Sequence, residues 1–373
     1  MMFPWVTHKE VALFCGRLLI LPRNEFTDAT SCVCQFNASP KCTLIANISI
    51  YMTTKPNHPK NQHTVPQFLL RNFAAGRQEQ VYAFDKLNGR SFISSTRNIA
   101  AEAGFYDFEH DGEQASLEPF MTRMETFVVG AIKSILHKQS LSHLSIEDRV
   151  AISLFAAVQM LRVRGNRHRI QSINGAIRRA LTDRRIDPAV FAPEMSNDDA
   201  KRASINSIQD ALEYAEHFYE KAWILHQAPH CSPLYTSDNP ITLHNMQKDF
   251  GRGNLGLTSP GIEIYLPLSK HFSICFFCLS SYQRILDAMH LAESMRKGDG
   301  TCPVDMSEVQ LIVDAVTKGT PLALLPDNVT HQNSLQVKYS SRFVYSSSDD
   351  FALVQSMLAS HPELKTPPEI RAE

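Results

Sequence analysis

The spacing of apolar residues predicts two amphipathic helices between residues 116 and 164. In the first helix, which Ser116 can cap, apolar residues recur every three to four positions: Leu117, Phe120, Met121, Met124, Phe127, Val128, Ala131 and Ile135. Ser145 opens the second helix, and Asp148 follows three residues later, which is a capping-box pattern with Asp in place of Glu. The apolar positions of this helix are Val150, Leu154, Val158 and Leu161.

The helical pattern continues, with interruptions, to about residue 222. We expect the second helix to end at Arg164, near Gly165, and to resume over residues 168–182. A third long helix is expected to begin at Ser196 or Asn197. Its apolar face consists of Ile205, Ile208, Leu212, Ala215, Tyr219 and Ala222.

Strand-like patterns lie on both sides of this helical block. Residues 81–85 and 91–95 flank a turn that contains Asn88-Gly89, which predicts a β-hairpin. Further strands are expected at 234–236, 241–244, 262–266, 272–278 and 342–346, and further helices at 65–73, 305–317 and 328–336. The order is an N-terminal hairpin, a helical block, then a mixed or antiparallel sheet with late helices. It predicts an α+β fold rather than alternating βα units.

The chain divides into an N-terminal extension and one domain. Residues 1–51 have an apolar run interrupted by Arg17 and no clean signal-peptide pattern. Met52 begins a polar leader, 52–60, that resembles an ordinary protein start, so we expect 1–51 to be a start-site error; a real, loosely ordered extension is the alternative. Residues 61–346 are expected to form a single α+β domain, and 347–373 a C-terminal helix and frayed tail.

Composition narrows the classes of protein. Of the 373 residues, 43% are hydrophobic, which is enough for a large core and too many for a disordered chain. No apolar run approaches the roughly 18–20 residues of a membrane helix, so we expect no membrane partner. The net charge of -1 does not indicate a nucleic-acid partner. The cysteines after residue 51 are interpreted as mostly buried thiols in a reducing, cytoplasmic compartment.

Positive charge nevertheless concentrates between Arg162 and Arg185. This segment holds eight arginines and one aspartate, a net charge of +7. Such density suits phosphate or nucleic-acid contact, and it equally suits a solvated helix face or pairing with acids elsewhere. Arg162 and Arg164 differ from the rest because they end an apolar helix and can point inward. The remaining candidates for phosphate contact are Arg167, Arg169, Arg178, Arg179, Arg184 and Arg185.

Three motif-like patterns are assigned no chemistry. The glycine pattern at residues 251–256 matches a dinucleotide fingerprint, but no helix follows it, which indicates a flexible loop. Cys275 and Cys278 would point to opposite faces of a strand and are interpreted as core cysteines. A proline between His226 and His230 breaks the helix that a zinc-binding pair would need.

Several polar residues align on apolar helix faces. Glu118 and Glu125 are seven residues apart, and Asp148, Gln159 and Arg162 share one face. Buried polar groups must find partners, so these residues form an internal network that ties the helices together, or else they line a pocket.

Two further motifs have a structural and a functional interpretation. His63 precedes the short helix expected at 65–73. Asp238 and Asn239 lie in a Ser-Asp-Asn-Pro turn between two strands, where such side chains often bond their own backbone. An acid at a strand end near a histidine is also a recurrent active-site arrangement.

Taken together, these motifs resemble domain of unknown function 4238 (DUF4238) over roughly residues 61–346. The matching positions, in order, are 63–73, 81–86, 105–106, Glu118, Glu125, Gln159, Arg162, 236–240, 267–269, Asn333 and 342–345. Thr64 departs from the family, in which an aromatic residue is commoner. The resemblance implies one domain, mainly microbial, without an established activity.

Two functions fit these observations. The first is a hydrolase-like pocket, acting on a phosphodiester, with His63 as general acid/base, Asp238 as its orienter or a metal ligand, and Arg162 or Arg164 as anion clamp. No cofactor is evident, but Glu118 and Glu125 would suit a divalent metal. Further pocket candidates are Gln67, Arg71, Gln159 and Asn239. The second function is a non-catalytic binding or regulatory module whose arginine-rich helix contacts a phosphate-containing ligand or nucleic acid.

Overall fold

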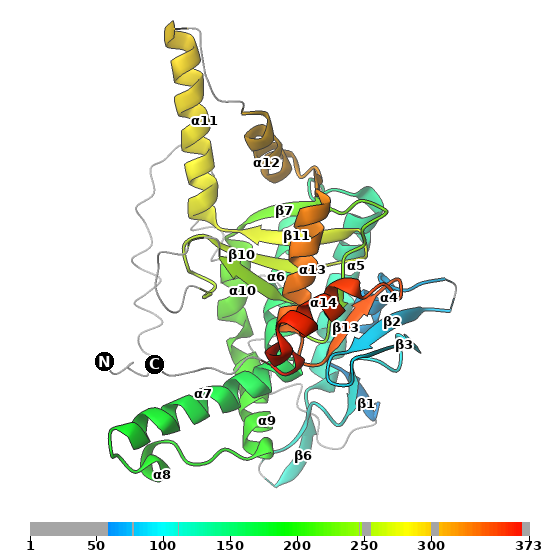
Figure 1. Cartoon of the computed structure of the whole chain (residues 1–373), viewed down its shortest axis with the longest axis vertical. Helices are drawn as coiled ribbons and strands as arrows, with labels where there is room; N and C mark the ends of the chain where they lie inside the picture. Colours follow the sequence, from blue (N-terminus) through cyan, green and yellow to red (C-terminus); the bar gives the residue numbers. More distant parts are fainter. Residues whose placement is uncertain are drawn as a thin grey trace.

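The computed structural model describes residues 59–76, 78–110, 112–245, 247, 255–299 and 306–367. The expected extension 1–51 and most of the leader 52–60 lie outside the described residues. Within them the chain is a mixed α+β protein, as the sequence predicts (Figure 1). No helix in this described part is long and apolar enough to cross a membrane.

Short antiparallel strands and one short helix come first in the chain. These elements are β1 (Asn61–His63), α4 (Gln67–Arg71), β2 (Gln80–Asp85), β3 (Arg90–Ser95), β4 (Ala101–Ala103), β5 (Asp107–His110) and β6 (Glu113–Ser116). The pairs are β1–β4, β2–β3 and β5–β6. The β2–β3 hairpin confirms the prediction, with Gly89 at a φ of 66° in its turn. The helix α4 is shorter than expected because it begins after Pro66.

The helical block follows. It consists of α5 (Glu118–Lys138), α6 (Ile146–Leu161), α7 (Arg164–Asp183), α8 (Pro188–Phe191), α9 (Asn197–Asn206), the 3-10 helix η2 (Ser207–Asp210) and α10 (Ala211–Tyr219). Ser145 and Asp148 form the predicted capping box, which engages Asp148 at the first turn of α6, at the opposite end of the helix from Gln159 and Arg162. The N-cap of α5 is Leu117 rather than Ser116.

Two helix boundaries differ from the prediction. The break after α6 falls at Arg162 and Val163, and Gly165 lies inside α7. The third helix is divided into α9, η2 and α10 and ends at Tyr219. Ala222, which was expected on its face, instead begins a strand. Ala222–Gln227 is an almost unbroken apolar run, and periodicity alone cannot separate a buried strand from a buried helix in such a run.

The second half of the chain supplies two larger sheets. Their strands are β7 (Ala222–Gln227), β8 (Thr236–Ser237), β9 (Thr242–Asn245), β10 (Ile262–Pro267), β11 (Phe272–Phe277), β12 (Leu322–Ala323) and β13 (Phe343–Ser346). One sheet has the order β12-β7-β11-β10-β9, and the other β3-β2-β13-β8. All pairs are antiparallel except β12 with β7.

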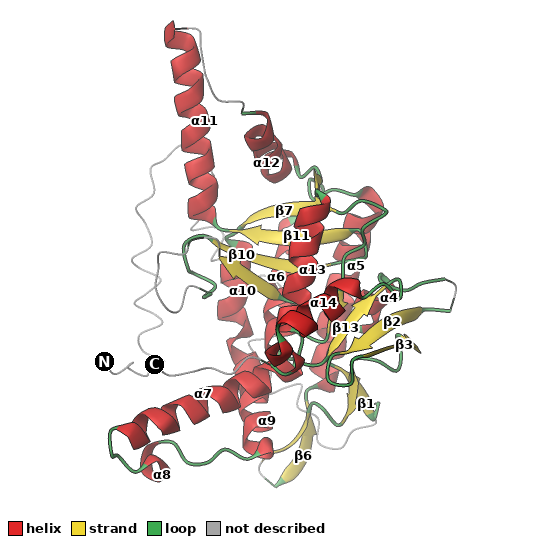
Figure 2. Ribbon diagram, in the orientation of Figure 1, coloured by secondary structure: helices red, strands yellow, loops and turns green. Residues whose placement is uncertain are grey.

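The late helices are α11 (Leu279–Asp299), α12 (Ser307–Lys318), α13 (Pro326–Tyr339) and α14 (Ala352–Ser360), followed by the 3-10 helix η3 (Pro362–Lys365). The sequence did not predict α11, and η3 forms where a frayed tail was expected. Figure 2 shows α11 extending from one end of the molecule and α7 with α8 from the other.

The five-stranded sheet is covered by helices on both faces. Alternate residues of a strand point to opposite faces, so Trp223 and Leu225 enter the main core while Ile224 lies on the other side. The main core is shared with the apolar faces of α5, α6 and α10, and Ile224 packs with residues of α12 and α13. This packing holds α5 and α6 side by side under the N-terminal strands.

A glycine fixes the loop between α5 and α6. Gly319, which ends α12 with a φ of 66°, accepts hydrogen bonds on its carbonyl from the Leu141 N–H (2.8 Å) and the Ser140 hydroxyl (2.9 Å). A Cβ atom at this position would lie 2.4 Å from the backbone nitrogen of Ser142. The α5–α6 loop and the end of α12 are therefore in direct backbone contact.

The three patterns without assigned chemistry occupy ordinary structural positions. Gly251 and Gly253 lie outside the described residues, and Gly256 sits in a turn before β10. Cys275 and Cys278 are both buried, as expected of core thiols. His226 is on strand β7, where its ring is hydrogen-bonded to Gln332.

Candidate functional site

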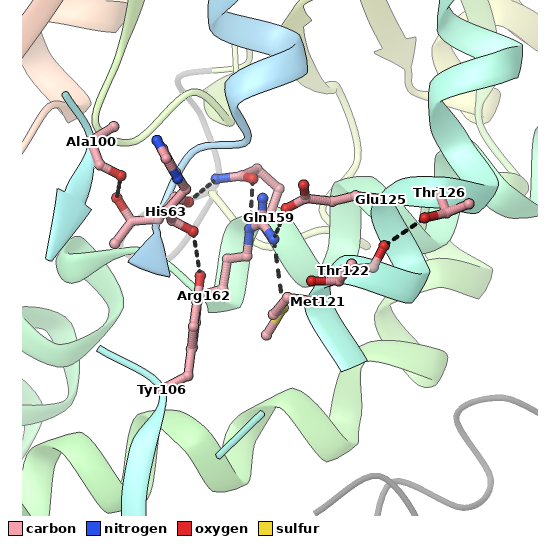
Figure 3. A network of polar contacts seen from close by, with 10 residues as sticks. His63, Ala100, Tyr106, Met121, Thr122, Glu125, Thr126, Gln159 and Arg162 are labelled. Atoms are coloured by element: carbon pink, nitrogen blue, oxygen red, sulfur yellow. Dashed lines mark hydrogen bonds and ion pairs between the residues drawn. The ribbon is translucent and has the colours of Figure 1, made fainter. Parts of the chain in front are cut away.

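The buried arginine at the end of α6 organises a polar cluster beneath β1 (Figure 3). Arg162 is 1% exposed, and its side chain turns inward because α6 ends at Leu161 and Arg162 is its C-cap. The Nε of Arg162 donates to Oε1 of Gln159 (2.9 Å), and its Nη1 donates to Oε1 of Glu125 (2.9 Å). The sequence placed Gln159 and Arg162 on one face, and the packing of α5 against α6 adds Glu125.

The same cluster fixes the backbone around His63. Nε2 of Gln159 donates to the carbonyl of Thr64 (2.9 Å), and the hydroxyl of Tyr106 donates to the carbonyl of His63 (2.9 Å). The Thr64 hydroxyl donates to the carbonyl of Ala100 (3.1 Å). Backbone contacts thus hold His63 at the end of β1, and one of them comes from Tyr106, which the sequence gave no chemical reason to select as a site residue.

Three buried polar atoms of this cluster have no hydrogen-bond partner among the described residues. They are Nε2 of His63, Oε2 of Glu118 and Nη2 of Arg162. Buried polar atoms without partners are rare and costly, and they are common where a ligand or an ordered water completes the site. We refer to His63, Glu118, Glu125, Gln159 and Arg162 as the His63 cluster.

Charge and burial set the protonation of the His63 cluster. Burial lowers the pKa of His63, opposed by the backbone of Thr96 and by the charge of Glu125. Burial, reinforced by the nearby Glu125 carboxylate, raises the pKa of Glu118 to about 7. Because Arg162 and Glu125 act on the pKa of both groups, all four side chains share one electrostatic environment. At neutral pH the cluster holds an unprotonated imidazole and a carboxyl group that is about half protonated.

Exposure distinguishes the floor of the cluster from its rim. Gln159 and Arg162 are fully buried, whereas His63 and Glu118 are half-buried. The Glu125 side chain is 27% exposed. His63 and Glu118 therefore meet solvent in part, although Nε2 of His63 and Oε2 of Glu118 are themselves buried, as is the guanidinium behind them.

The second predicted motif forms a separate hydrogen-bonded anchor. The Asp238 carboxylate accepts from the backbone N–H groups of Ser341 (2.7 Å), Arg342 (2.8 Å) and Phe343 (3.0 Å). Asn239 donates to the carbonyl of Tyr339 (3.1 Å). These bonds fasten the turn after β8 to the loop between α13 and β13. The contacts of Asp238 are thus structural, and its predicted pairing with His63 stays a prediction.

Charged residues at the end of β2 and just before β13 complete this anchor. Lys86 is fully buried, and its Nζ donates to the carbonyls of Val337 (2.9 Å) and Ser340 (2.7 Å). Burial lowers the pKa of Lys86 to about 8, with the Asp238 charge acting against this effect. Asp85 binds the guanidinium of Arg342 through both carboxylate oxygens (2.9 and 2.6 Å). We refer to Asp85, Lys86, Asp238 and Arg342 as the Asp238 anchor.

Tyr345 lies between the two clusters. Burial and the Asp238 charge raise the pKa of its phenol, whereas the backbone of Ala100 and the charge of Arg164 act against this effect. Ala100 in turn accepts the N–H of Thr64 (2.7 Å), next to His63. The fold therefore brings the two motifs into one region without a direct contact between His63 and Asp238 in the described hydrogen bonds.

The other predicted site residues have surface or local roles. Arg164 and Arg167 both pair with Glu102, and Arg167 also stacks over the Phe105 ring (3.6 Å). Gln67 contacts the hydroxyl of Thr96 (3.5 Å). Arg71 forms an exposed ion pair with Glu79 (2.8 Å).

The arginines further along α7 point away from the His63 cluster. Arg169 donates to Asn166 (2.9 Å), and Arg178 donates to the carbonyl of Ala192 (2.5 Å). Arg179, Arg184 and Arg185 are exposed near the end of α7. Phosphate contact by these residues stays a prediction. Among the described residues, no three His, Cys, Asp or Glu side chains are arranged to hold a metal ion.

A known family matches the part of the chain that contains both motifs. The model of the family described as protein of unknown function DUF4238 matches residues 61–350. The chain belongs to the DUF4238 family. No curated protein and no solved structure matches it.

The motifs of this DUF4238 domain divide between the two clusters. His63, Gln159 and Arg162 belong to one, while the segments 81–86, 236–240 and 342–345 meet in the other. Sequence reasoning missed Lys86 as a partner of the Asp238 turn. A lysine directly after the strand Gln80–Asp85, whose residues 81–84 are apolar, was the available signal, since a strand end of this kind is buried in the sheet.

Proposed function

We propose that this DUF4238 domain is a hydrolase that acts on a phosphodiester at the His63 cluster. The observation that carries the proposal is the set of three buried, unpartnered atoms on an imidazole, a carboxyl group and a guanidinium. A phosphate oxygen satisfies the guanidinium, and water and the leaving oxygen satisfy the other two groups. The described residues hold eight further buried polar atoms without partners, but these three lie on side chains that share one electrostatic environment.

Each group has the protonation state that its role requires. Hydrolysis needs a base to take a proton from water, an acid to protonate the leaving oxygen and a positive group to stabilise the phosphoryl oxygens. The lowered pKa of His63 keeps Nε2 free to accept a proton at neutral pH. The pKa of Glu118, about 7, lets its carboxyl group donate one. Arg162 stays charged and supplies Nη2 to the anion.

The role given to the acid differs from the sequence-based hypothesis. Asp238 is engaged by three backbone N–H groups, so Glu118 takes the place of the acidic partner in this proposal. Two titratable groups whose environments move their pKa values in opposite directions are typical of acid–base pairs in hydrolases. His63 and Glu118 form such a pair.

A screen of the full chain tests the proposal. Bis(4-nitrophenyl) phosphate and single-stranded and duplex DNA would be offered with and without Mg²⁺, Mn²⁺ and Zn²⁺. We expect turnover by the wild type and a loss of at least about 100-fold in His63→Ala and Glu118→Gln, as for removal of an acid or base. The matched controls are His137→Ala and Glu113→Gln, both at exposed positions, which should retain activity.

The pH profile gives a second readout. Activity should fall above pH 7 as Glu118 loses its proton, and it should fall in acid as His63 gains one. In Glu118→Gln the residual activity should lose the alkaline limb. Absence of turnover on every substrate, or full activity in both variants, would overturn the proposal and favour a non-catalytic binding module.

A further inference from the structure

Helices α7 and α8 form an arm that extends from the body of the protein (Figure 2). We define the α7–α8 arm as residues 164–193. Its base is fixed by Asn166, whose side chain donates to Ser204 (3.3 Å) and Ser207 (3.0 Å). Gln171 extends the contact with α9 by donating to Asn197 (3.0 Å), and beyond it α7 turns most of its side chains to solvent or to α8.

Large apolar side chains are exposed along the arm. Between residues 173 and 191 they are Ile173 (41% exposed), Ile177 (48%), Ile186 (38%), Val190 (70%) and Phe191 (70%). Exposed apolar residues that stand alone need no explanation, but a cluster marks a surface that meets an apolar partner.

The apolar residues of the two helices lie in one patch. Ile173 and Ile177 are one helical turn apart and so lie on the same face of α7. Asn174 donates to the carbonyl of Pro193 (3.2 Å), which holds the end of α8 beside that part of α7. The end of α8, which includes Phe191, is therefore held beside the segment of α7 that carries the exposed isoleucines.

Positive charge surrounds this patch. Between residues 169 and 191 the chain carries five arginines and two aspartates, and no lysine or glutamate. Arg178 donates its hydrogen bond to a backbone carbonyl, which is neutral, so this contact does not neutralise the positive charge of the guanidinium. Arg184 and Arg185 are exposed in the turn toward α8. The arm thus combines an apolar patch with a cationic border.

We propose that the α7–α8 arm binds the surface of membranes that contain anionic phospholipids. A helical element with exposed apolar residues and arginines at their border lies in the interface, where the apolar side chains enter the acyl boundary and the guanidiniums meet phosphates. Nucleic acid explains the arginines, and its bases stack on aromatic residues such as Phe191, but it offers no matching contact for the exposed aliphatic residues Ile173, Ile177 and Val190. The sequence-based expectation of no membrane partner rested on the absence of a spanning segment, which interfacial binding does not need.

Vesicle co-sedimentation of the full chain tests the proposal. Vesicles of phosphatidylcholine with about 30% phosphatidylserine, an anionic fraction similar to that of natural membranes, would be compared with vesicles of pure phosphatidylcholine. We expect binding to the anionic vesicles alone, weakened by salt. Arg184→Gln should weaken partitioning about fivefold, and Phe191→Asp should weaken it by more than about tenfold.

Matched controls distinguish binding through the α7–α8 arm from nonspecific adsorption to vesicles. Leu291→Asp on α11 changes an exposed apolar side chain outside the arm, and Arg90→Gln on β3 an exposed arginine; both should bind as the wild type does. Thermal melting should show that all four variants fold. Failure of the wild type to bind anionic vesicles, or unimpaired binding by Phe191→Asp, overturns the proposal. So does binding to duplex DNA or to an acidic peptide without binding to vesicles. None of these outcomes bears on the hydrolase activity, which is measured without lipid.

Discussion

The His63 cluster and the Asp238 anchor each combine buried and partly exposed polar or charged residues, yet they differ in how completely the buried atoms of these residues are hydrogen-bonded. In the anchor, one carboxylate receives three backbone N–H groups, and Lys86 and Arg342 each make two hydrogen bonds. In the His63 cluster, an acid, a base and a guanidinium each keep an unpartnered buried atom.

This difference separates polar residues that hold the fold from polar residues available for chemistry. Saturated hydrogen bonding stabilises a loop but leaves no lone pair or N–H group for a ligand. Incomplete hydrogen bonding costs stability and is retained where a ligand supplies the missing contacts. The comparison predicts that substitutions in the anchor affect unfolding, whereas substitutions in the His63 cluster affect activity.

The largest effect is expected for Asp238→Ala. The change leaves three backbone N–H groups near β13 without their acceptor, and it removes the anion nearest to Lys86. We expect the free energy of unfolding to fall by about 3–5 kcal/mol, enough to leave much of the chain unfolded. Urea denaturation measures this loss. Asp199→Ala, which removes an exposed capping residue, is the control and should cost much less. A loss below that of the control would show that the anchor is dispensable.

A smaller loss is expected for Arg162→Met. The guanidinium holds Gln159 and Glu125 in place, but Glu125 is partly exposed and can be hydrated once its partner is gone. We expect the free energy of unfolding to fall by about 2–3 kcal/mol, less than for a fully buried pair. Arg164→Met at its half-exposed pair with Glu102 should cost under about 1 kcal/mol. Equal losses of unfolding free energy in the two variants would contradict the interpretation that Arg162 stabilises the fold through buried contacts.

Glu118→Gln should change stability in a direction that depends on pH. Folding raises the pKa of Glu118 from 4.5 to about 7, so its contribution is present below pH 4.5 and is lost as pH rises through 7. Above pH 7 the ionised carboxylate destabilises the fold, by about 1–2 kcal/mol after allowance for its partial exposure.

The glutamine variant should therefore be more stable than the wild type at pH 8 and nearly equal to it at pH 4.5. Urea denaturation at both pH values measures the difference, with Glu113→Gln as a control that shows no such dependence. Gain of stability with loss of turnover is the result expected of a residue retained for chemistry. A variant that is no more stable than the wild type at pH 8 would contradict it.

The smallest effect is expected for Arg71→Ala. The ion pair of Arg71 with Glu79 joins side chains that are 45% and 53% exposed, so its loss should cost under about 0.5 kcal/mol. Arg71 was a candidate pocket residue, and its exposed position in an ion pair with Glu79 predicts unchanged turnover as well. A tenfold fall in turnover would place Arg71 in the site.

Local signals in the sequence predicted local structure well. The Ser145–Asp148 capping box and the Asn88-Gly89 turn depend on residues within a few positions of one another, and both form as predicted. The helix α11 was missed because its exposed face carries Leu279, Leu291 and Met295, so it lacks a clean apolar stripe.

The candidate site was predictable in part for the same reason. Helical spacing placed Gln159 beside Arg162, and the hydrogen bond between them confirms that face. The approach of Glu125 to Arg162 depends on how α5 packs against α6, which no spacing in one helix encodes. The partners of Asp238 lie more than 100 residues away, so its backbone cradle could not be distinguished from an active-site turn.

Tolerance to substitution should change sharply from one position to the next around Gly319. Its neighbours Lys318 and Thr320 are exposed, so a library that randomises them should return almost every amino acid. At position 319 any side chain collides with the backbone of Leu141 and Ser142, and its φ of 66° penalises every residue other than glycine. Selection for folded protein should therefore recover one codon family at 319 between two positions that are nearly unrestricted.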